Sequence, residues 1–183
     1  IDKPGNYPSL YNTQRVKALE AELRTIRSKL FSAKKKETKL KFRQKDKELR
    51  NAIATELEKS GWKNETAQKL AAWDPYDQKE SSPFFDREWM FDLTEGFDII
   101  IGNPPFLGQK GNKEIFQEIQ KSELGKLYHQ RRMDLFYFFF HFSIKNCKEN
   151  GLISFITTNY FLTATYSDKL RAHLKNETTF LKI

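Results

Sequence analysis

Apolar side chains recur at helical spacing through the first third of the chain. Between Thr13 and Lys59 there is neither proline nor glycine, and apolar positions follow one another in steps of three and four. These positions are Val16, Leu19, Leu23, Ile26 and Leu30, and then Leu49, Ile53 and Leu57. Residues 31–41 between the two groups are lysine-rich and weakly periodic, so we expect an antiparallel helical hairpin that turns near residues 32–36. One long helix is the alternative, and Gly61 is the expected stop.

A connector rich in aromatic and acidic residues follows. We expect a short helix that Asn64 caps and that runs to Ala72, because Asp74-Pro75 disfavours continuation of a helix. The mixture of aromatic and acidic side chains up to Phe91 is typical of a surface-packed connector. Caps and turns are the expected roles of the aspartates in this stretch, Asp74, Asp77 and Asp86.

The second half of the chain alternates strand and helix patterns. Three β-branched residues in Phe97–Ile101 predict a strand that is buried on both faces. A strongly apolar helix from Met133 to Cys147, a strand at Leu152–Ile156, a helix capped by Ser167 and a third strand that begins near Phe180 follow. This order predicts an α/β fold with a parallel sheet and right-handed crossovers.

A stiff loop follows the first predicted strand. Gly102 permits tight backbone geometry, while Pro104 and Pro105 fix φ and donate no backbone hydrogen bond. The loop should therefore present the Asn103 amide, backbone carbonyls and the Phe106 ring at the carboxyl end of a strand, where open α/β sheets bind ligands. An amide oxygen and a stiffly held carbonyl suit the two N–H groups of an amine, and an aromatic ring suits stacking on a nucleobase. The alternative is a proline-bracketed turn with a core phenylalanine.

The sequence Asn-Pro-Pro-Phe after an apolar strand resembles the catalytic loop of S-adenosylmethionine-dependent amino-methyltransferases, especially the adenine-N6 DNA methyltransferases. The resemblance covers roughly residues 74–183. It includes the aromatic lead-in to the strand, which is similar to that of large single-chain restriction–modification methyltransferases and implies packing rather than binding roles for Trp89 and Phe91. It implies direct transfer of a methyl group from S-adenosylmethionine to adenine N6, without a covalent enzyme intermediate.

The resemblance also implies roles for individual residues. Asn103 and Pro104 match the pair that accepts the hydrogens of the target amine, and Pro105 matches a residue that touches the cofactor. Phe106 matches the ring that stacks on an adenine flipped out of double-stranded DNA. The run that begins at Asp134 is similar to the helix that closes the cofactor pocket, and the residues that would pack on the cofactor's adenine ring are Leu135 and Phe139. For these two, plain core packing is the alternative.

The chain also departs from the family pattern. The glycine-rich loop that cradles the methionine part of the cofactor, and the acidic residues that hold its ribose and adenine, have no counterpart in these 183 residues. We therefore expect a fragment of the enzyme, the second half of a Rossmann-like methyltransferase sheet preceded by a basic helical hairpin or long helix. The expected segments are a helical arm at residues 1–62, a connector with short helices at 63–96 and a partial catalytic domain at 97–183. The missing remainder of the polypeptide is an expected partner, and the cofactor pocket is expected to be incomplete.

The positive charge is concentrated in the arm. Residues 13–60 contain 15 Lys and Arg against 7 Asp and Glu, and the remainder contains 17 of each, so the arm accounts for the net charge of +8. Clustered lysines bind phosphates without regard to sequence, and the candidates for nucleic-acid contact are Lys34, Lys35 and Lys36. The alternatives are a solvated outer face and an arm that packs against a neighbouring domain.

Other site classes receive little support from the sequence. The single cysteine, Cys147, excludes a disulfide framework within the chain, and His129, His141 and His173 lack ligand-like spacing, so we expect no metal site. We expect no membrane span, because the richest apolar run is too short. A reducing interior agrees with the lone cysteine, and the resemblance implies the cytoplasm of a bacterium or archaeon.

The function expected from the sequence is site-specific adenine methylation in a restriction–modification or phage-defence system. An alternative is methylation of a protein glutamine or an RNA base, which the same loop would serve. A further alternative, for the isolated chain, is a non-catalytic module that binds DNA or protein.

Overall fold

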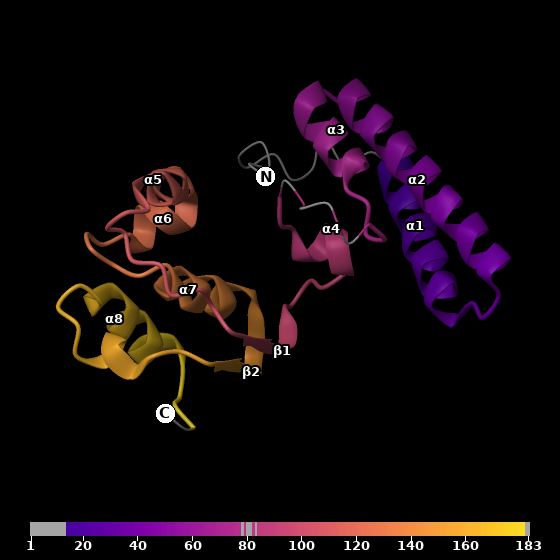
Figure 1. The fold of residues 1–183 in the computed structure, drawn as a ribbon. Helices are drawn as coiled ribbons and strands as arrows, with labels where there is room; N and C mark the ends of the chain where they lie inside the picture. Colours follow the sequence, from indigo (N-terminus) through magenta and orange to yellow (C-terminus); the bar gives the residue numbers. More distant parts are fainter. Residues whose placement is uncertain (1–13, 78, 80–81, 83, 182–183) are drawn as a thin grey trace. The chain divides into compact units, whose positions relative to one another are not determined.

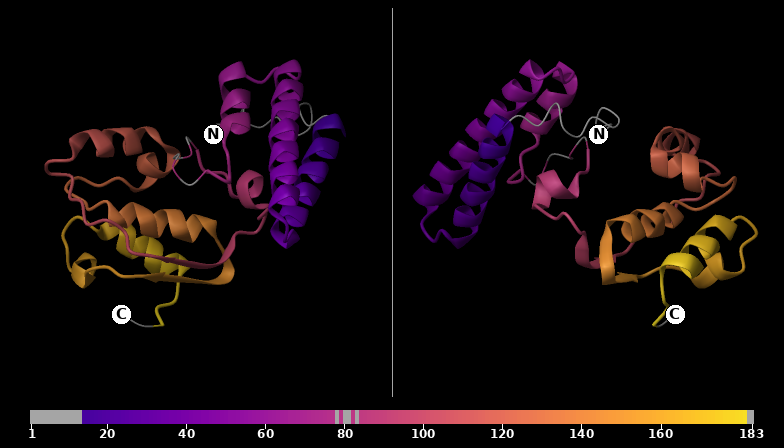
Figure 2. Two further views of the ribbon diagram at one scale, coloured as in Figure 1. Left: turned by 45° about the vertical axis from the view of Figure 1, so that its right-hand side comes forward. Right: turned by 180° about the vertical axis from the view of Figure 1, so that it is seen from behind.

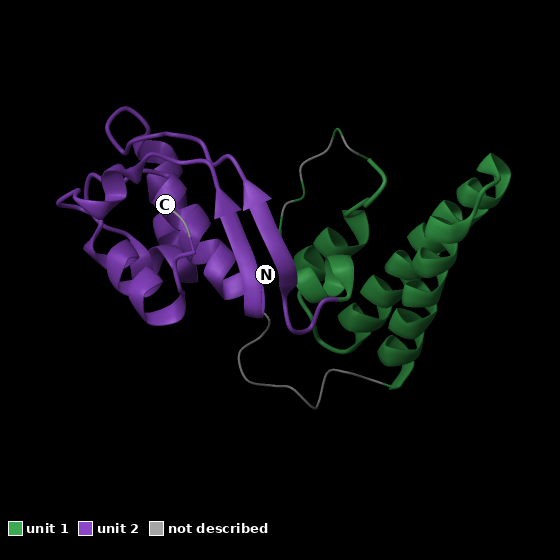
Figure 3. Cartoon of the chain, turned by 90° about the horizontal axis from the view of Figure 1, so that it is seen from below, with its two compact units in different colours: residues 1–92 green, residues 93–183 purple. Residues whose placement is uncertain are grey.

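The structure is a computed structural model that describes residues 14–77, 79, 82 and 84–181. The first 13 residues of the expected arm lie outside the described residues. The chain divides into two compact units, residues 1–92 and residues 93–183, which Figure 3 distinguishes by colour. Each unit is described by itself.

The first unit is built on a helical hairpin. Helix α1 (Gln14–Ser32) and helix α2 (Lys36–Lys59) run side by side in both views of Figure 2, so the expected hairpin is confirmed and one long helix is wrong. The helix α2 ends as expected, because the Ser60 N–H donates to the Glu56 and Leu57 carbonyls and Gly61 has a φ of 91°. The seam between the helices consists of the predicted apolar positions Val16, Leu19, Leu23, Leu49, Ile53 and Leu57.

Two short helices after the hairpin pack onto it. Helix α3 (Asn64–Ala72) contributes Ala67, Leu70 and Ala71 to the same core, and Trp89 of helix α4 (Arg87–Phe91) packs against it. The predicted cap at Asn64 is wrong, since Lys63 occupies the N-cap position and the Asn64 amide donates to Glu58 instead (3.0 Å). Asp86 does cap α4, and its carboxylate accepts the Glu88 and Trp89 N–H groups. Phe91 is half-exposed beside Phe85, at 6.3 Å between ring centroids, so its packing is only partial.

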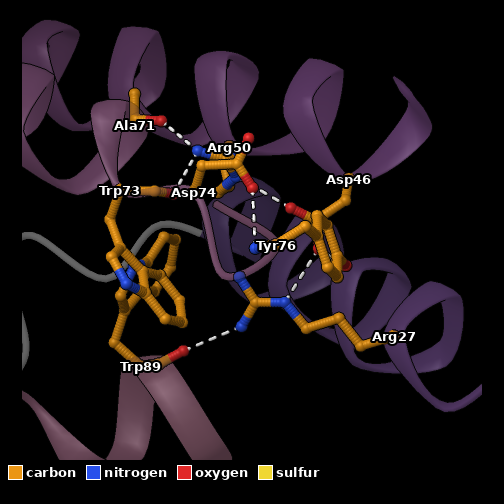
Figure 4. A network of polar contacts seen from close by, with 8 residues as sticks. All are labelled: Arg27, Asp46, Arg50, Ala71, Trp73, Asp74, Tyr76 and Trp89. Carbon is orange, nitrogen blue, oxygen red and sulfur yellow. Dashed lines mark hydrogen bonds and ion pairs between the residues drawn. The ribbon is translucent and has the colours of Figure 1, made fainter. Parts of the chain in front are cut away.

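A buried carboxylate joins these parts (Figure 4). Asp46 is fully buried in α2 and accepts hydrogen bonds from Arg27 Nε (2.9 Å), Arg50 Nε (2.8 Å) and the Tyr76 hydroxyl (2.9 Å). Burial, and then the charge of Asp46, raise the pKa of Tyr76. Both guanidinium groups continue to backbone carbonyls: Arg27 reaches Trp89, and Arg50 reaches Ala71 and Trp73. One side chain therefore ties the hairpin to the connector.

The second unit contains a two-stranded parallel sheet and several helices (Figure 1). Strands β1 (Phe97–Gly102) and β2 (Cys147–Phe155) are adjacent, and their arrowheads point the same way in Figure 3. Between them the chain forms α5 (Lys113–Lys121), α6 (Glu123–Tyr128) and α7 (Phe136–Asn146), and after β2 it forms the 3-10 helix η1 (Asn159–Leu162) and α8 (Asp168–Glu177). The expected mixed α/β character with parallel strands is confirmed.

Three details of this unit differ from the prediction. The helix α7 begins at Phe136 rather than Met133, and Cys147 begins β2 instead of ending the helix. Ser167 stands before α8, but its hydroxyl donates to the Phe161 and Ala164 carbonyls rather than capping the helix. Residues 178–181 form no strand in the described part of the chain, so the strand expected near Phe180 is wrong there.

The prediction that the first strand is buried on both faces is also wrong. One face of the sheet packs on α7, where Phe140 lies 5.1 Å from Phe155 between ring centroids. The other face is open to solvent, with Ile99 60% and Ile101 76% exposed. We call this the open sheet face, and it also contains Leu152 and, just after β2, Ile156. No described segment covers these side chains. The apolar composition of a strand does not show whether the residues that pack on it belong to the same stretch of sequence.

A histidine pair lies in the core of the second unit. His141 is fully buried, and its Nδ1 lies 2.7 Å from Nδ1 of His173, so one ring must donate and the other accept. Tyr128 stacks on His141 at 3.9 Å between ring centroids. The Nε2 atom of His141 is buried and has no partner among the described residues. The structure thus gives these two histidines packing roles.

This pair predicts acid sensitivity. Burial, followed by the charge of His173, lowers the pKa of His141 to about 3, and burial lowers the pKa of His173. Below about pH 6.5 the unfolded chain binds a proton at His141 that the folded chain does not. The contribution of His141 to the free energy of unfolding is therefore complete above that pH and declines on acidification, by up to about 1.4 kcal/mol per pH unit. Urea unfolding at pH 7 and pH 5 should show a smaller difference for His141→Phe than for the unchanged chain. Equal differences would contradict this assignment.

Candidate functional site

The Asn103–Phe106 loop leaves β1 at the carboxyl end of the sheet and faces solvent. Asn103 is exposed, and its amide makes no hydrogen bond within the described part of the chain. Pro104 is buried, Pro105 is exposed, and Phe106 is 52% exposed. The Phe106 ring packs edge-to-face with Phe136 of α7, at 5.8 Å between centroids and 73° between planes. The loop is thus accessible to solvent, and Phe136 supports its aromatic ring. The alternative of a turn with a core phenylalanine is wrong, because Phe106 is about half exposed.

A short antiparallel bridge fastens the end of this loop to the start of α7. Gly108 pairs with Asp134, the Leu135 N–H donates to the Leu107 carbonyl (2.8 Å), and the Gln109 N–H donates to the Met133 carbonyl (3.1 Å). The Asp134 carboxylate accepts the N–H of Leu107 (3.0 Å). Segments far apart in sequence are therefore joined next to the exposed amide and ring.

The Gln109 side chain adds a second fastening. Its oxygen accepts the Arg132 N–H (2.6 Å), at a residue whose φ of 61° lies in the left-handed region. Its Nε2 approaches Nε2 of His129 (3.3 Å), which Gln120 also approaches (2.8 Å). Two amide donors at one ring nitrogen require a neutral imidazole, and burial lowers the pKa of His129, which favours that form.

Of the two residues predicted to pack on a cofactor, Leu135 is bonded to the end of the loop and Phe139 lies one helical turn further along α7. Leu135 precedes α7 and is half-buried, and its backbone bonds to the residue after Phe106. Phe139 is 39% exposed and follows Leu135 by four positions, so the two share a helix face. The structure therefore brings Asn103, Phe106 and Leu135 into one neighbourhood and leaves apolar surface available on Phe139. Neither Leu135 nor Phe139 is fully buried in the core.

The segment after β2 belongs to the same edge and received no role from the sequence. The Ile156 N–H donates to the Gly102 carbonyl (3.1 Å), so the chain leaves the two parallel strands side by side. Thr158, Asn159 and Tyr160 follow and are exposed, Tyr160 to 67%. The rule that parallel strands end at the same edge would have pointed to these residues once both strands were predicted.

Lys34, Lys35 and Lys36 lie at the turn of the hairpin in the first unit. All three are exposed, and none has an ion-pair partner among the described residues. Between Lys29 and Lys45 the only acidic residue is Glu37, so the tip is strongly basic. The structure thus leaves this end of the hairpin accessible to a polyanion.

Comparison with known proteins identifies the family. A model of the family described as Eco57I restriction-modification methylase matches residues 13–183. The chain belongs to this family. The resemblance to restriction–modification methyltransferases is thereby confirmed, while the roles assigned to single residues remain predictions. No helix in the described part of this Eco57I-family chain is both long and apolar enough to cross a membrane.

Individual relatives agree with the family. The type II methyltransferase M.HincII of Haemophilus influenzae is 35% identical over 88 residues, covering 48% of this chain and 18% of the relative. The adenine-specific methyltransferase BrxX of Escherichia coli O9:H4 (strain HS) is 26% identical over 117 residues, covering 62% of this chain and 9% of the relative. The type II methyltransferase M.BstVI of Geobacillus stearothermophilus is 33% identical over 91 residues, covering 45% of this chain and 15% of the relative. The chain thus spans less than one fifth of the length of these relatives. No solved structure shows significant similarity.

Proposed function

We propose that the full-length protein transfers a methyl group from S-adenosylmethionine to N6 of an adenine in double-stranded DNA, as part of a restriction–modification or phage-defence system. The observation that carries the proposal is the solvent-facing Asn103–Phe106 loop at the carboxyl edge of the sheet in a chain of the Eco57I restriction-modification methylase family. The name of BrxX, a relative, includes adenine specificity.

The loop offers the groups that this reaction needs. The lone pair of an exocyclic adenine amine is delocalised into the ring, so the amine is a weak nucleophile. The Asn103 side-chain oxygen and the Pro104 carbonyl would accept its two N–H groups and direct the lone pair toward the methyl group. The exposed face of Phe106 would stack on the flipped base, while Phe136 behind it keeps the ring in place.

The residues present fit part of the cofactor. Leu135 and Phe139 present adjoining, partly exposed apolar surface suited to the cofactor's adenine ring, and Pro105 is exposed next to the reacting groups. When bound, S-adenosylmethionine supplies an electrophilic methyl group on a sulfonium. Groups for its methionine and ribose would come from the remainder of the polypeptide.

The open sheet face also suggests that another part of the polypeptide completes this unit. Parallel strands are normally covered on both faces, yet Ile99 and Ile101 are largely exposed. We infer that further strands and helices of the same protein cover this face and complete a Rossmann-like sheet. The 183-residue chain alone is then expected to bind cofactor weakly and not to turn over. Micromolar S-adenosylmethionine binding by this chain in calorimetry would contradict that inference.

The decisive experiment identifies the methylated product. The full-length protein is incubated with methyl-labelled S-adenosylmethionine and DNA free of methylated adenine, and the DNA is then digested to nucleosides. We expect the label on N6-methyl-deoxyadenosine. Parallel reactions with RNA and with glutamine-containing protein test the alternative substrates, and label found only there would overturn the proposal.

The hairpin tip should contribute sequence-independent DNA affinity. Changing Lys34, Lys35 and Lys36 to glutamate removes three cations that would release counterions from DNA. We expect weaker duplex binding by the full-length protein, and a slope of log K against log salt that is shallower by roughly 0.9 for each lost phosphate contact. Fluorescence anisotropy at several salt concentrations measures both quantities.

A matched variant separates local contact from overall charge. Lys121, Lys126 and Lys175 of the second unit are also exposed, and their change to glutamate alters the net charge equally. The tip variant should weaken binding more than this control. Equal effects would mean that the tip is only a solvated face.

A further inference from the structure

The catalytic loop proposed above has few ways to hold its own position. Pro104 and Pro105 donate no backbone hydrogen bond, and the Asn103 amide is unpaired among the described residues. The first backbone donor with a described partner after the prolines is the Leu107 N–H, which donates to the Asp134 carboxylate. Apart from the burial of Pro104 and the contact of Phe106 with Phe136, the described contacts that hold the loop are hydrogen bonds made just beyond Phe106.

Asp134 is built to provide that contact. The same carboxylate oxygen accepts Leu107 N–H (3.0 Å), from the loop, and Phe136 N–H (3.3 Å), from the first turn of α7. It thereby connects a loop residue to the helix whose Phe136 ring supports Phe106. On either side of the Gly108–Asp134 bridge, the Leu135 N–H bonds to the Leu107 carbonyl and the Gln109 N–H bonds to the Met133 carbonyl. These two backbone bonds fix the same antiparallel pairing of the two segments. No other described carboxylate bonds to the loop.

We propose that Asp134 is a positioning residue for methyl transfer, because it sets the place of the Asn103–Phe106 loop relative to α7. This inference rests on the proposed function. Asp134 does not touch the reacting atoms and acts through the loop. Its loss should leave the loop attached by backbone bonds but displaced, and displacement of a reacting group by about 1 Å can cost about 10²-fold in rate.

The test uses the full-length protein, with methyl transfer from labelled S-adenosylmethionine to DNA free of methylated adenine as the readout. We expect Asp134→Ala to lower kcat by about 10- to 100-fold while changing KM for either substrate little. Asp134→Asn retains an oxygen acceptor and should recover most of the rate, which also covers the case in which the alanine variant fails to fold.

A double variant shows whether Asp134 acts through Asn103. If it does, Asn103→Ala combined with Asp134→Ala should lose less than the product of the two single losses, because groups that work as a unit are not additive. Asp86→Ala is the matched control, since Asp86 also accepts two backbone N–H groups at a helix start, in the other unit. It should leave kcat unchanged.

The outcomes separate the two proposals. Normal kcat for Asp134→Ala, or losses that multiply in the double variant, would overturn the positioning role while the proposed function stands. Normal kcat for Asn103→Ala would instead remove the catalytic assignment on which both depend.

Discussion

Asn103→Ala in the full-length protein should lower kcat for methyl transfer by about 10²–10³-fold. In the proposed mechanism the amide oxygen holds the adenine amine most strongly while positive charge develops on its nitrogen, so the lost hydrogen bond would be felt mainly in the transition state. The magnitude follows the loss of one oxyanion-hole donor in other enzymes. Since ground-state binding is little changed, kcat and kcat/KM should fall together. Single-turnover transfer of a labelled methyl group to DNA measures the effect.

A loss of stability should not account for the lower kcat of Asn103→Ala. The Asn103 amide makes no hydrogen bond within the described part of the chain, so its removal should change the free energy of unfolding by less than about 0.5 kcal/mol. Asn176→Ala, at an exposed position on α8, provides a control with the same chemical change and should keep normal activity. Near-normal turnover by Asn103→Ala would refute the assigned role.

Asp46→Ala should cost about 3–5 kcal/mol of stability in the first unit. It removes the shared acceptor of two guanidinium groups and a phenol, and it leaves Arg50 charged and buried without a carboxylate. The Arg50 side chain is only 3% exposed, so water cannot replace the lost partner. Because the network joins α1, α2 and the connector, their packing should loosen together. Urea unfolding followed by tryptophan fluorescence should report the loss, since Trp73 and Trp89 flank Arg27.

A surface pair on the same helix provides the comparison. Glu56 bonds to Lys59 at 2.8 Å where the lysine is largely exposed, and Glu56→Ala should change stability by less than about 1 kcal/mol. Similar losses for both variants would mean that the Asp46 network contributes no more than an ordinary surface ion pair.

The sequence allowed the parts that depend on local pattern to be predicted. The two hairpin helices follow from apolar spacing, and the break between them follows from the lysine-rich stretch. The accessible loop follows from glycine and two prolines after a β-branched run, because those residues leave few backbone conformations. Trp89 was predicted to pack, and it does.

Other features depend on partners distant in the sequence, which a local pattern does not contain. Asp46 and Arg50 are spaced like a surface i,i+4 pair, yet Arg27 and Tyr76 arrive from elsewhere and the site is buried. Asp134 would pass for an ordinary charge near a helix start, and its bond to Leu107 spans 27 positions. Asn64 looks like a cap but finds Glu58 instead. The exposure of Ile99 is likewise a property of what surrounds the strand, not of its composition.

The open sheet face has a practical consequence for anyone who produces this chain recombinantly. A row of branched hydrocarbon side chains beside unpaired strand edges is a template on which identical molecules add to one another. Insolubility of such a preparation would thus reflect exposed strands rather than misfolded helices. Covering the open sheet face, as the proposed remainder of the protein would do, is then a better remedy than a change of buffer.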